Sequence, residues 1–344
     1  MSSCCTVVTR DFLPFARALT SSILRHNPGH HAYVLVADSE MIPSDRSGFV
    51  DEVTLLSTSD IGIDAAEFNR RGAMFGPSGL ACSFKAPLLR HLVRETGKAG
   101  LYLDADGLVF GDLSSIFELA ALHDLVLSPH IHSPINRRAA GFELEETFLK
   151  FGVFNGGLVA VAPSAAPFLE WWTERTSRRC IVAPEQGYIV DQHWLTLAPA
   201  LFPAVVLRHP GTNVMWWNLY ERDVVWIGDN PTISGTDLVY FHFAGFDFGE
   251  QVTLGPDNQA WRAGLPSFEQ RPGTRRLCAY YADELRTAGY MDPHKGAPSF
   301  VTLPDGSLFT EADRSRYREL VEWAELQGHP EPPNPFSEMS SRLT

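Results

Sequence analysis

Two aspartates, Asp104 and Asp106, stand one residue apart directly after the apolar run Leu101–Leu103. Two carboxylates this close repel each other unless they share a positive charge. Two kinds of chemistry use such a pair. In one, both carboxylates bind a divalent cation that also holds phosphate oxygens. In the other, Asp104 attacks a phosphate ester and Asp106 acts as the general acid. The pair alone leaves both open.

The elements around the pair place it at the edge of a sheet. Residues Gly100–Leu103 have the pattern of a short buried strand, and the helical pattern Ser83–Arg94 precedes it. In open α/β sheets, ligands bind outside the carboxyl ends of the strands. We therefore expect Asp104 and Asp106 to lie in a binding site.

The start of the chain predicts an α/β fold of the doubly wound, nucleotide-binding type. A strand at Cys4–Thr9 is followed by a helix that opens at Asp11 and ends before Asn27, and then by strands at His31–Ala37 and Glu52–Leu56. Such an order is typical of a mixed, mostly parallel central sheet flanked by helices.

The second half of the chain is less regular. Its patterns predict strands at Leu125–Ser128, Val153–Ala162 and Leu238–Phe243, and helices at Ala165–Ser177 and Asp191–Leu201.

Beyond residue 261 the connections become rich in Pro and Gly, which predicts a mainly helical C-terminal extension. Its expected elements are a helix at Thr274–Ala288, a hairpin turn at Leu303–Gly306 and a helix at Glu311–Gln327 with Thr310 as N-cap and Gly328 past its end. We divide the chain into a catalytic domain, 1–260, and an accessory extension, 261–344. Within the domain, 1–115 is the nucleotide-binding half and 116–260 the acceptor-side half.

Composition narrows the possible partners. The chain has 344 residues, 44% of them apolar, and its 41 acidic against 28 basic residues give a formal charge of −13. Because nucleic-acid binding needs a concentrated basic surface and no Lys/Arg-rich run is present, we expect no nucleic-acid partner. A phosphorylated ligand stays possible if a cation screens it.

The amino terminus and the cysteines point to a cytoplasmic protein. The first apolar run is interrupted at Arg10 and Asp11, so it predicts a strand and not a signal peptide. No run approaches the roughly 18 to 20 apolar residues that span a bilayer. The five cysteines have neither zinc-site spacing nor the density of a disulfide scaffold, which indicates buried thiols.

A phosphatase of the haloacid dehalogenase-like group is one interpretation of the acids. The segment DADGLV resembles that group's nucleophile motif, and Ile227–Asn230 resembles its later magnesium-binding motif. Against it, about a hundred patterned residues precede the motif, and Leu108 replaces the usual Thr or Val. The later segment also has the composition of an ordinary turn.

The other interpretation rests on several motifs in order. They are TVVTRDFLPFARAL at 6–19, SFKAPLLRHL before YLDAD, FNGGL at 154–158, DQHWL at 191–195, PGTNVMWWNLYER at 210–222 and YFHFAGF at 240–246. In order and spacing, residues 4–250 resemble the galactosyltransferase/glycogenin-like families and their bacterial relatives, which are nucleotide-sugar transferases. The resemblance implies the GT-A fold.

The resemblance also assigns roles to single residues. It implies metal ligands at Asp104, Asp106 and His242, contacts with the nucleotide sugar from Thr9, Asp11, Lys85, Asp104, Arg138 and Gly245, and catalytic roles for Asn155, Asp191 and Gln192. Independently, alternation along Leu238–Phe243 puts Tyr240 and His242 on one face and Val239, Phe241 and Phe243 on the other.

Some of these positions have alternative interpretations. The families' motif after His242 continues to a lysine, but position 248 is Phe, so Lys85, Arg137 or Arg138 would have to contact the phosphate instead. His242 could equally be a buried histidine bonded to a carbonyl, and Asp191 a helix N-cap.

Two further positions stay open as well. Trp216 and Trp217 could stack on a sugar or belong to the core.

Together these features predict a metal-dependent glycosyltransferase. It would use Mn²⁺ or Mg²⁺ to move a hexose-type sugar from a nucleoside-diphosphate sugar to an acceptor hydroxyl, with retention of configuration. A UDP-sugar is preferred as donor over a GDP- or dTDP-sugar. The acceptor would be a carbohydrate, a lipid-linked glycan or a natural product. The alternatives are the phosphatase, with Asp104 as nucleophile, and a non-catalytic subunit that binds nucleotide sugars.

Overall fold

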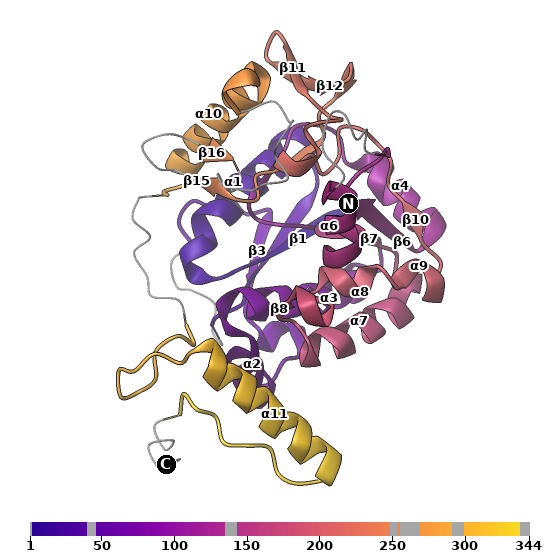
Figure 1. The fold of residues 1–344 in the computed structure, drawn as a ribbon. Helices are drawn as coiled ribbons and strands as arrows, with labels where there is room; N and C mark the ends of the chain where they lie inside the picture. Colours follow the sequence, from indigo (N-terminus) through magenta and orange to yellow (C-terminus); the bar gives the residue numbers. More distant parts are fainter. Residues whose placement is uncertain are drawn as a thin grey trace.

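A computed structural model describes residues 2–39, 46–134, 143–247, 253–254, 268–290 and 299–337. The strands of its central sheet are β1 (Ser3–Val8), β2 (His31–Val36), β3 (Val53–Leu56), β4 (Gly100–Leu103), β6 (Leu125–Pro129), β7 (Phe154–Val161) and β10 (Val205–Val206). They lie in the order β10-β6-β7-β4-β1-β2-β3 (Figure 1). Neighbours run parallel except at β7, which is antiparallel to β4 and β6. The predicted α/β class with a mixed, mostly parallel sheet is confirmed.

Helices cover both faces of this sheet. One face packs against α2 (Ala65–Ser83), α3 (Lys85–Thr96) and α7 (Ala166–Arg178). The other packs against α1 (Leu13–His26) and α4 (Ser114–His123). Because both faces are covered, every residue of β4 and β7 is buried, which explains why these strands read as continuous apolar runs.

A short pair of strands lies beyond the end of β4. In this pair β5 (Gly107–Val109) runs antiparallel to β14 (Tyr240–His242), with His242 opposite Gly107. Gly107 has to lack a side chain, because a Cβ there would lie 2.3 Å from the Tyr240 hydroxyl oxygen. The pairing therefore brings residue 242 next to the loop that carries the two aspartates.

The predicted alternation along this segment is largely confirmed. Phe241 and Phe243 pack together in one apolar cluster, whereas Tyr240 lies in another. Val239 is the exception, since it packs with Tyr240 and not with the phenylalanines.

The C-terminal extension is mainly helical over its described residues, as predicted. Helix α10 (Pro272–Thr287) packs against α1, and α11 (Glu311–Gln327) packs against α2 at the opposite end of the molecule (Figure 1). Thr310 forms the predicted N-cap, with a capping box to Asp313, and Gly328 adopts a left-handed conformation past the C-terminus. The hairpin turn at 303–306 is also present.

Two helix predictions need correction. The helix expected from Ser83 begins at Lys85, and Ser83 instead ends α2, which the sequence patterns did not predict. The single helix expected at 191–201 is two short turns, α8 (Gln192–Leu195) and α9 (Ala198–Leu201). Pro199 lies in the first turn of α9, and its missing N–H cannot continue the ladder of α8.

The remaining elements are small. They are α6 (Glu143–Phe151), β8 (Val182–Ala183), β9 (Tyr188–Ile189), β11 (Val224–Ile227), β12 (Asn230–Ile233), β13 (Thr236–Asp237), β15 (Phe246–Asp247) and β16 (Thr253–Leu254). Among the helices that the structure describes, none combines the length and apolarity needed to cross a bilayer.

Truncating the buried centre of β7 should destabilise the fold. Leu158 is 0% exposed, so we expect Leu158→Ala to lower the free energy of unfolding by about 2 to 5 kcal/mol. Leu122 is 75% exposed on α4, and Leu122→Ala is the matched control with an expected change within about 0.5 kcal/mol. Urea denaturation followed by circular dichroism measures both. Equal losses in the two variants would contradict the burial pattern.

Candidate metal centre and its surroundings

The two aspartates lie where β4 ends and β5 begins. The backbone N–H of Asp104 donates to the Gly157 carbonyl at 3.0 Å, and the backbone carbonyl of Asp106 accepts from the Phe243 N–H at 2.7 Å. These bonds tie the loop to β7 on one side and to the end of β14 on the other. Both carboxylates are partly exposed, at 23% and 32%, so a ligand from solvent can reach them.

His242 completes a cluster of three side chains. Its Nε2 lies 3.0 Å from Asp106 Oδ1 and 3.8 Å from Asp104 Oδ2. One ligand atom from each residue lies within 4.8 Å of the other two, and no other such group of acids, histidines and cysteines occurs in the described ranges. The predicted ligand set Asp104, Asp106 and His242 is thus brought together.

A glycine makes room for the imidazole. A Cβ at Gly157 would lie 2.6 Å from His242 Cε1 and 2.7 Å from Asn155 Oδ1. No backbone carbonyl bonds to the His242 ring within the part of the chain that is described, and its Nδ1 is buried without a hydrogen bond there. The alternative of a histidine held by a carbonyl is therefore not what the geometry shows.

Charge couples His242 to its neighbour. Burial opposes the charged form of both side chains, but their attraction and hydrogen bond outweigh it. As a result the pKa of His242 is raised and the pKa of Asp106 is lowered. The contact therefore favours the protonated form of His242 and the ionised form of Asp106.

Lys85 supplies a second positive charge on the other side of Asp104. Its Nζ lies 2.9 Å from Asp104 Oδ1 and 3.5 Å from Asp191 Oδ1, and it donates to the Gly156 carbonyl at 3.2 Å. Burial lowers the pKa of Lys85, but Asp104 and Asp191 more than compensate and leave it well above its usual value. Lys85 is buried between the two carboxylates as a fixed cation.

Two tyrosines hold Asp104 in place. Tyr102 donates its hydroxyl to Asp104 Oδ1 at 2.7 Å, and Tyr240 donates to the Asp104 backbone carbonyl at 2.9 Å. The Lys85 ammonium also lies 4.9 Å from the centre of the Tyr102 ring. Consequently Oδ1 is engaged on the lysine side while Oδ2 faces His242.

Asp191 is a buried carboxylate that packs directly on the backbone. A Cβ at Gly156 would lie 2.3 Å from Asp191 Oδ2. Burial raises the pKa of Asp191, and Lys85 opposes the rise. Asp191 occupies the N-cap position of α8, as the alternative predicted, but its side chain makes no capping hydrogen bond.

Asn155 and Gln192 belong to a network of amides beside Asp191. Asn155 Oδ1 accepts from the Gly157 N–H at 2.9 Å and from Asn213 Nδ2 at 3.1 Å. Its Nδ2 lies 3.4 Å from Gln192 Oε1, and Gln192 Nε2 donates to the Phe151 carbonyl at 3.1 Å. The three predicted catalytic residues therefore lie side by side with fixed orientations.

The other predicted contact residues are less closely grouped. Thr9 is buried just past the end of β1, the strand beside β4, and Asp11 follows it in a short turn. Gly245 has a φ of 70°, the left-handed conformation that a non-glycine residue rarely adopts. Arg137 and Arg138 lie outside the described residues, as does Phe248.

Sequence reasoning missed several residues that shape the site. Tyr102 and Tyr240 hold Asp104, and Asn213 orients Asn155. Trp217, left open between sugar and core, donates its indole N–H to His130 Nδ1 at 3.1 Å. All of these residues except His130 lie inside the motifs quoted above. Membership of a motif was therefore the sequence signal that could have identified them.

The phosphatase interpretation finds no support in the second acidic motif. Gly228 and Asp229 form the turn between β11 and β12, as the turn alternative predicted. The Asp229 side chain is fully exposed and pairs with Arg276 of α10 at 2.8 Å. It is not among the described acids that cluster with Asp104.

Comparison with curated proteins gives one partial match. The chain is 31% identical over 173 residues to the uncharacterized protein YfnF of Bacillus subtilis strain 168, which covers 48% of this chain and 55% of that protein. The chain thus spans about half the length of the curated relative it matches. No description of a known protein family matches the chain.

Several solved structures are similar in their chain trace. The galactosyltransferase LgtC, in complex with donor and acceptor sugar analogs, is 13% identical with a TM-score of 0.46, over 86% of this chain and 98% of LgtC. The glycosyltransferase GlyE of Streptococcus pneumoniae is 15% identical with a TM-score of 0.44, over 86% and 66%. Mouse xyloside xylosyltransferase 1 is 12% identical with a TM-score of 0.42, over 70% and 97%. At these identities the likeness concerns the fold, so activity has to be inferred from the site residues.

The coupling of His242 to Asp106 predicts a pH dependence. A histidine whose folded pKa is raised stabilises the protein fully below its unfolded pKa of 6.5, and this stabilisation is lost as the pH rises through the folded pKa. In the presence of a chelator, the free energy of unfolding should therefore fall as the pH rises above about 6.5. His242→Gln should flatten that fall. Urea titrations across this range measure it, and parallel profiles for both proteins would refute the coupling.

Proposed function

We propose that this chain is a glycosyltransferase that depends on a divalent cation and uses a nucleoside-diphosphate sugar as donor. The observation that carries the proposal is the convergence of Asp104, Asp106 and His242 at the end of β4. The order of the motifs along residues 4–250 supports it, because the residues that those motifs single out lie around this point.

The three side chains fit a divalent metal ion. Mn²⁺ readily binds both carboxylates and imidazoles, and Mg²⁺ prefers the carboxylate oxygens. The ligand atoms of the three side chains lie close together, since His242 Nε2 is 3.0 Å from Asp106 Oδ1 and one atom of each residue lies within 4.8 Å of the other two. A bound cation would supply positive charge to the diphosphate leaving group.

The chain's own residues would act on the sugar. Asp191, Gln192 and Asn155 lie together beside Lys85, behind the metal ligands. Asp191 would offer negative charge to an oxocarbenium-like state, and Lys85 would hold the Asp191 carboxylate ionised despite its burial. As the resemblance implies, the acceptor hydroxyl would attack on the side of the leaving group, with retention of configuration.

The donor and acceptor classes follow the same resemblance. We expect a UDP-sugar in preference to a GDP- or dTDP-sugar, and an acceptor that is a carbohydrate, a lipid-linked glycan or a natural product. We assign the chemistry to residues 1–260 and an accessory role to 261–344, and we place the protein in the cytoplasm.

Removing one metal ligand should abolish turnover and leave the fold intact. We expect Asp106→Asn to lower donor hydrolysis and transfer at least about 100-fold, because a developing diphosphate charge would no longer be offset. Excess EDTA should do the same to the native protein, and Mn²⁺ should restore activity. Release of nucleoside diphosphate from a panel of nucleotide sugars measures the rate.

A second aspartate provides the control. The transferase proposal expects full activity from Asp229→Asn, since Asp229 is exposed at a hairpin turn. The phosphatase interpretation expects that variant to be inactive, and expects phosphate release from small phosphoesters. Undiminished turnover in Asp106→Asn would defeat the metal role. Tight nucleotide-sugar binding without transfer or hydrolysis would indicate a non-catalytic subunit.

A further inference from the structure

Helix α2 is broken in its interior. Gly76 has φ 69° and ψ −176°, outside the helical region, and Pro77 follows it. A helix that stops at this point leaves the carbonyls of its last turn without intrahelical donors. Pro77 has no N–H, so the Ala73 carbonyl in particular cannot find its usual partner four residues on.

Two arginines from α11 bond to these carbonyls. Arg314 Nη1 donates to the Gly72 carbonyl at 2.8 Å and to the Ala73 carbonyl at 3.1 Å. Arg318 Nη1 donates to the Met74 carbonyl at 2.6 Å. Both arginines are buried. The C-terminal helix thus provides the cap that the first half of α2 lacks.

The break also brings the arginine close to the backbone. A Cβ at Gly76 would lie 3.2 Å from the guanidinium carbon of Arg314. Next to it, the Phe300 ring occupies the place where a Cβ of Gly72 would lie, at 2.5 Å. At both glycines of α2, a side chain of the C-terminal extension occupies the space that a larger residue would need.

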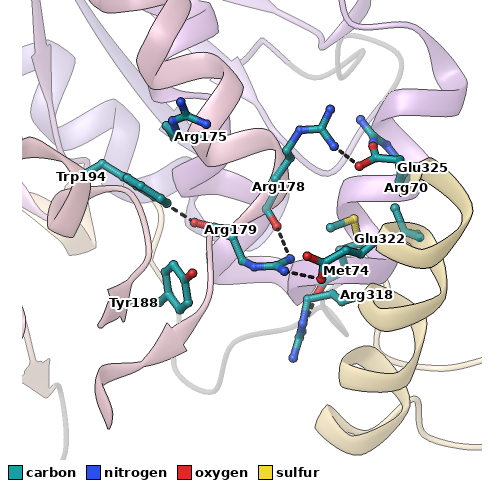
Figure 2. Close-up of a pocket in the computed structure, with 11 residues that line it drawn as sticks. Arg70, Met74, Arg175, Arg178, Arg179, Tyr188, Trp194, Arg318, Glu322 and Glu325 are labelled. Atoms are coloured by element: carbon teal, nitrogen blue, oxygen red, sulfur yellow. Dashed lines mark hydrogen bonds and ion pairs between the residues drawn. The ribbon is translucent and has the colours of Figure 1, made fainter. Parts of the chain in front are cut away.

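The cleft between α2, α7 and α11 shows what else holds α11 (Figure 2). Arg178 and Arg179 at the end of α7 form ion pairs with Glu325 and Glu322 of α11. These side chains are 27% to 52% exposed, and exposed ion pairs contribute little to stability. Arg70 of α2, which is 13% exposed, also pairs with Glu325 at 3.4 Å. Arg314 and Arg318 are more buried than any of these ion-pair partners, at 5% and 9%.

The second half of α2 leads directly into the site. Ser83 ends it, and Arg71 from the first half donates to the Ser83 carbonyl at 2.7 Å. Lys85, which lies between Asp104 and Asp191, begins α3 two residues later. Cys82 lies within electrostatic reach of Asp191 and Lys85. The direction in which α2 continues after its break sets the place of all these groups.

We propose that α11 is a positioning element for the acid–lysine cluster. By capping the first half of α2, Arg314 and Arg318 fix the path of Pro77–Ser83 and so hold Lys85 against Asp104 and Asp191. The effect of α11 on catalysis rests on the proposed function, whereas its effect on the position of Lys85 does not. The C-terminal extension then helps to position the residues of the site.

The five cysteines allow a test in the full-length protein without any substrate. Cys180 and Cys82 both pack in the cluster that contains Tyr317 and Val321 of α11, whereas Cys4, Cys5 and Cys278 lie in β1 and α10. Alkylation rates, read by peptide mass spectrometry, report on α11 at the first two thiols and on the rest of the fold at the other three. Acetylation of the Lys85 amine, which is buried between Asp104 and Asp191, reports on the site in the same digests.

We expect Arg314→Met and Arg318→Met to raise labelling of Cys180, Cys82 and Lys85 at least about tenfold, with Cys4, Cys5 and Cys278 unchanged, because the opening is local. Arg316→Met, on the exposed side of the same helix, is the matched control and should change nothing. Arg314→Lys keeps the charge but lacks the second nitrogen, with which Arg314 also bonds to the Phe300 carbonyl, so its effect should be intermediate.

Three outcomes would overturn the proposal. Faster labelling of all five thiols would show a global loss of stability. Faster labelling of Cys180 and Cys82 with unchanged acetylation of Lys85 would show that α11 undocks without moving the site. No change would show that the arginines position nothing. Labelling decides the placement even if the native protein turns over no nucleotide sugar, an outcome that would refute only the proposed function. If the native protein is active, donor kcat/KM should fall in Arg314→Met and not in Arg316→Met.

Discussion

Asp104 lies between two positive groups, and the rest of the site depends on that placement. Its Oδ1 faces Lys85 and the Tyr102 hydroxyl, and its Oδ2 faces His242. Three acids gathered in a poorly solvated place need compensating charge, because burial penalises each ionised carboxylate. Lys85 provides it on the Oδ1 side of Asp104, and the imidazole of His242 lies on the Oδ2 side. One side of Asp104 is therefore fixed and the other is open to a ligand.

Much of the fold was predictable, because the strands of the central sheet are covered on both faces and so appear as apolar runs. Where helices had clear apolar periodicity and caps, as at 311–327, the bounds agree with the structure. Helix α2 was missed since Gly72, Gly76, Pro77 and Gly79 are typical of a loop, and only tertiary contacts explain them. β5 has only three residues, too few to show the alternation that identifies a strand. Its pairing with β14 joins segments that are far apart in the chain, so no local pattern predicts it.

The identity of the site residues was more predictable than their arrangement in space. Motif order brought attention to Asp104, Asp106 and His242, and the structure brings these three together. Nothing in the sequence shows that Lys85 is enclosed between two acids, or that the glycines of FNGGL leave space for Asp191 and His242. Such facts depend on distances between segments far apart in the chain, and no local pattern records them.

The pairing of β5 with β14 has a consequence for biosynthesis. The hydroxyl of Tyr240 reaches back across 136 residues to the backbone of Asp104, and His242 follows two positions later. During translation the two aspartates leave the ribosome long before the imidazole that completes their cluster. A chain interrupted in between would carry adjacent acids with no imidazole beside them, so the three-residue cluster can form only after residue 242 has been made.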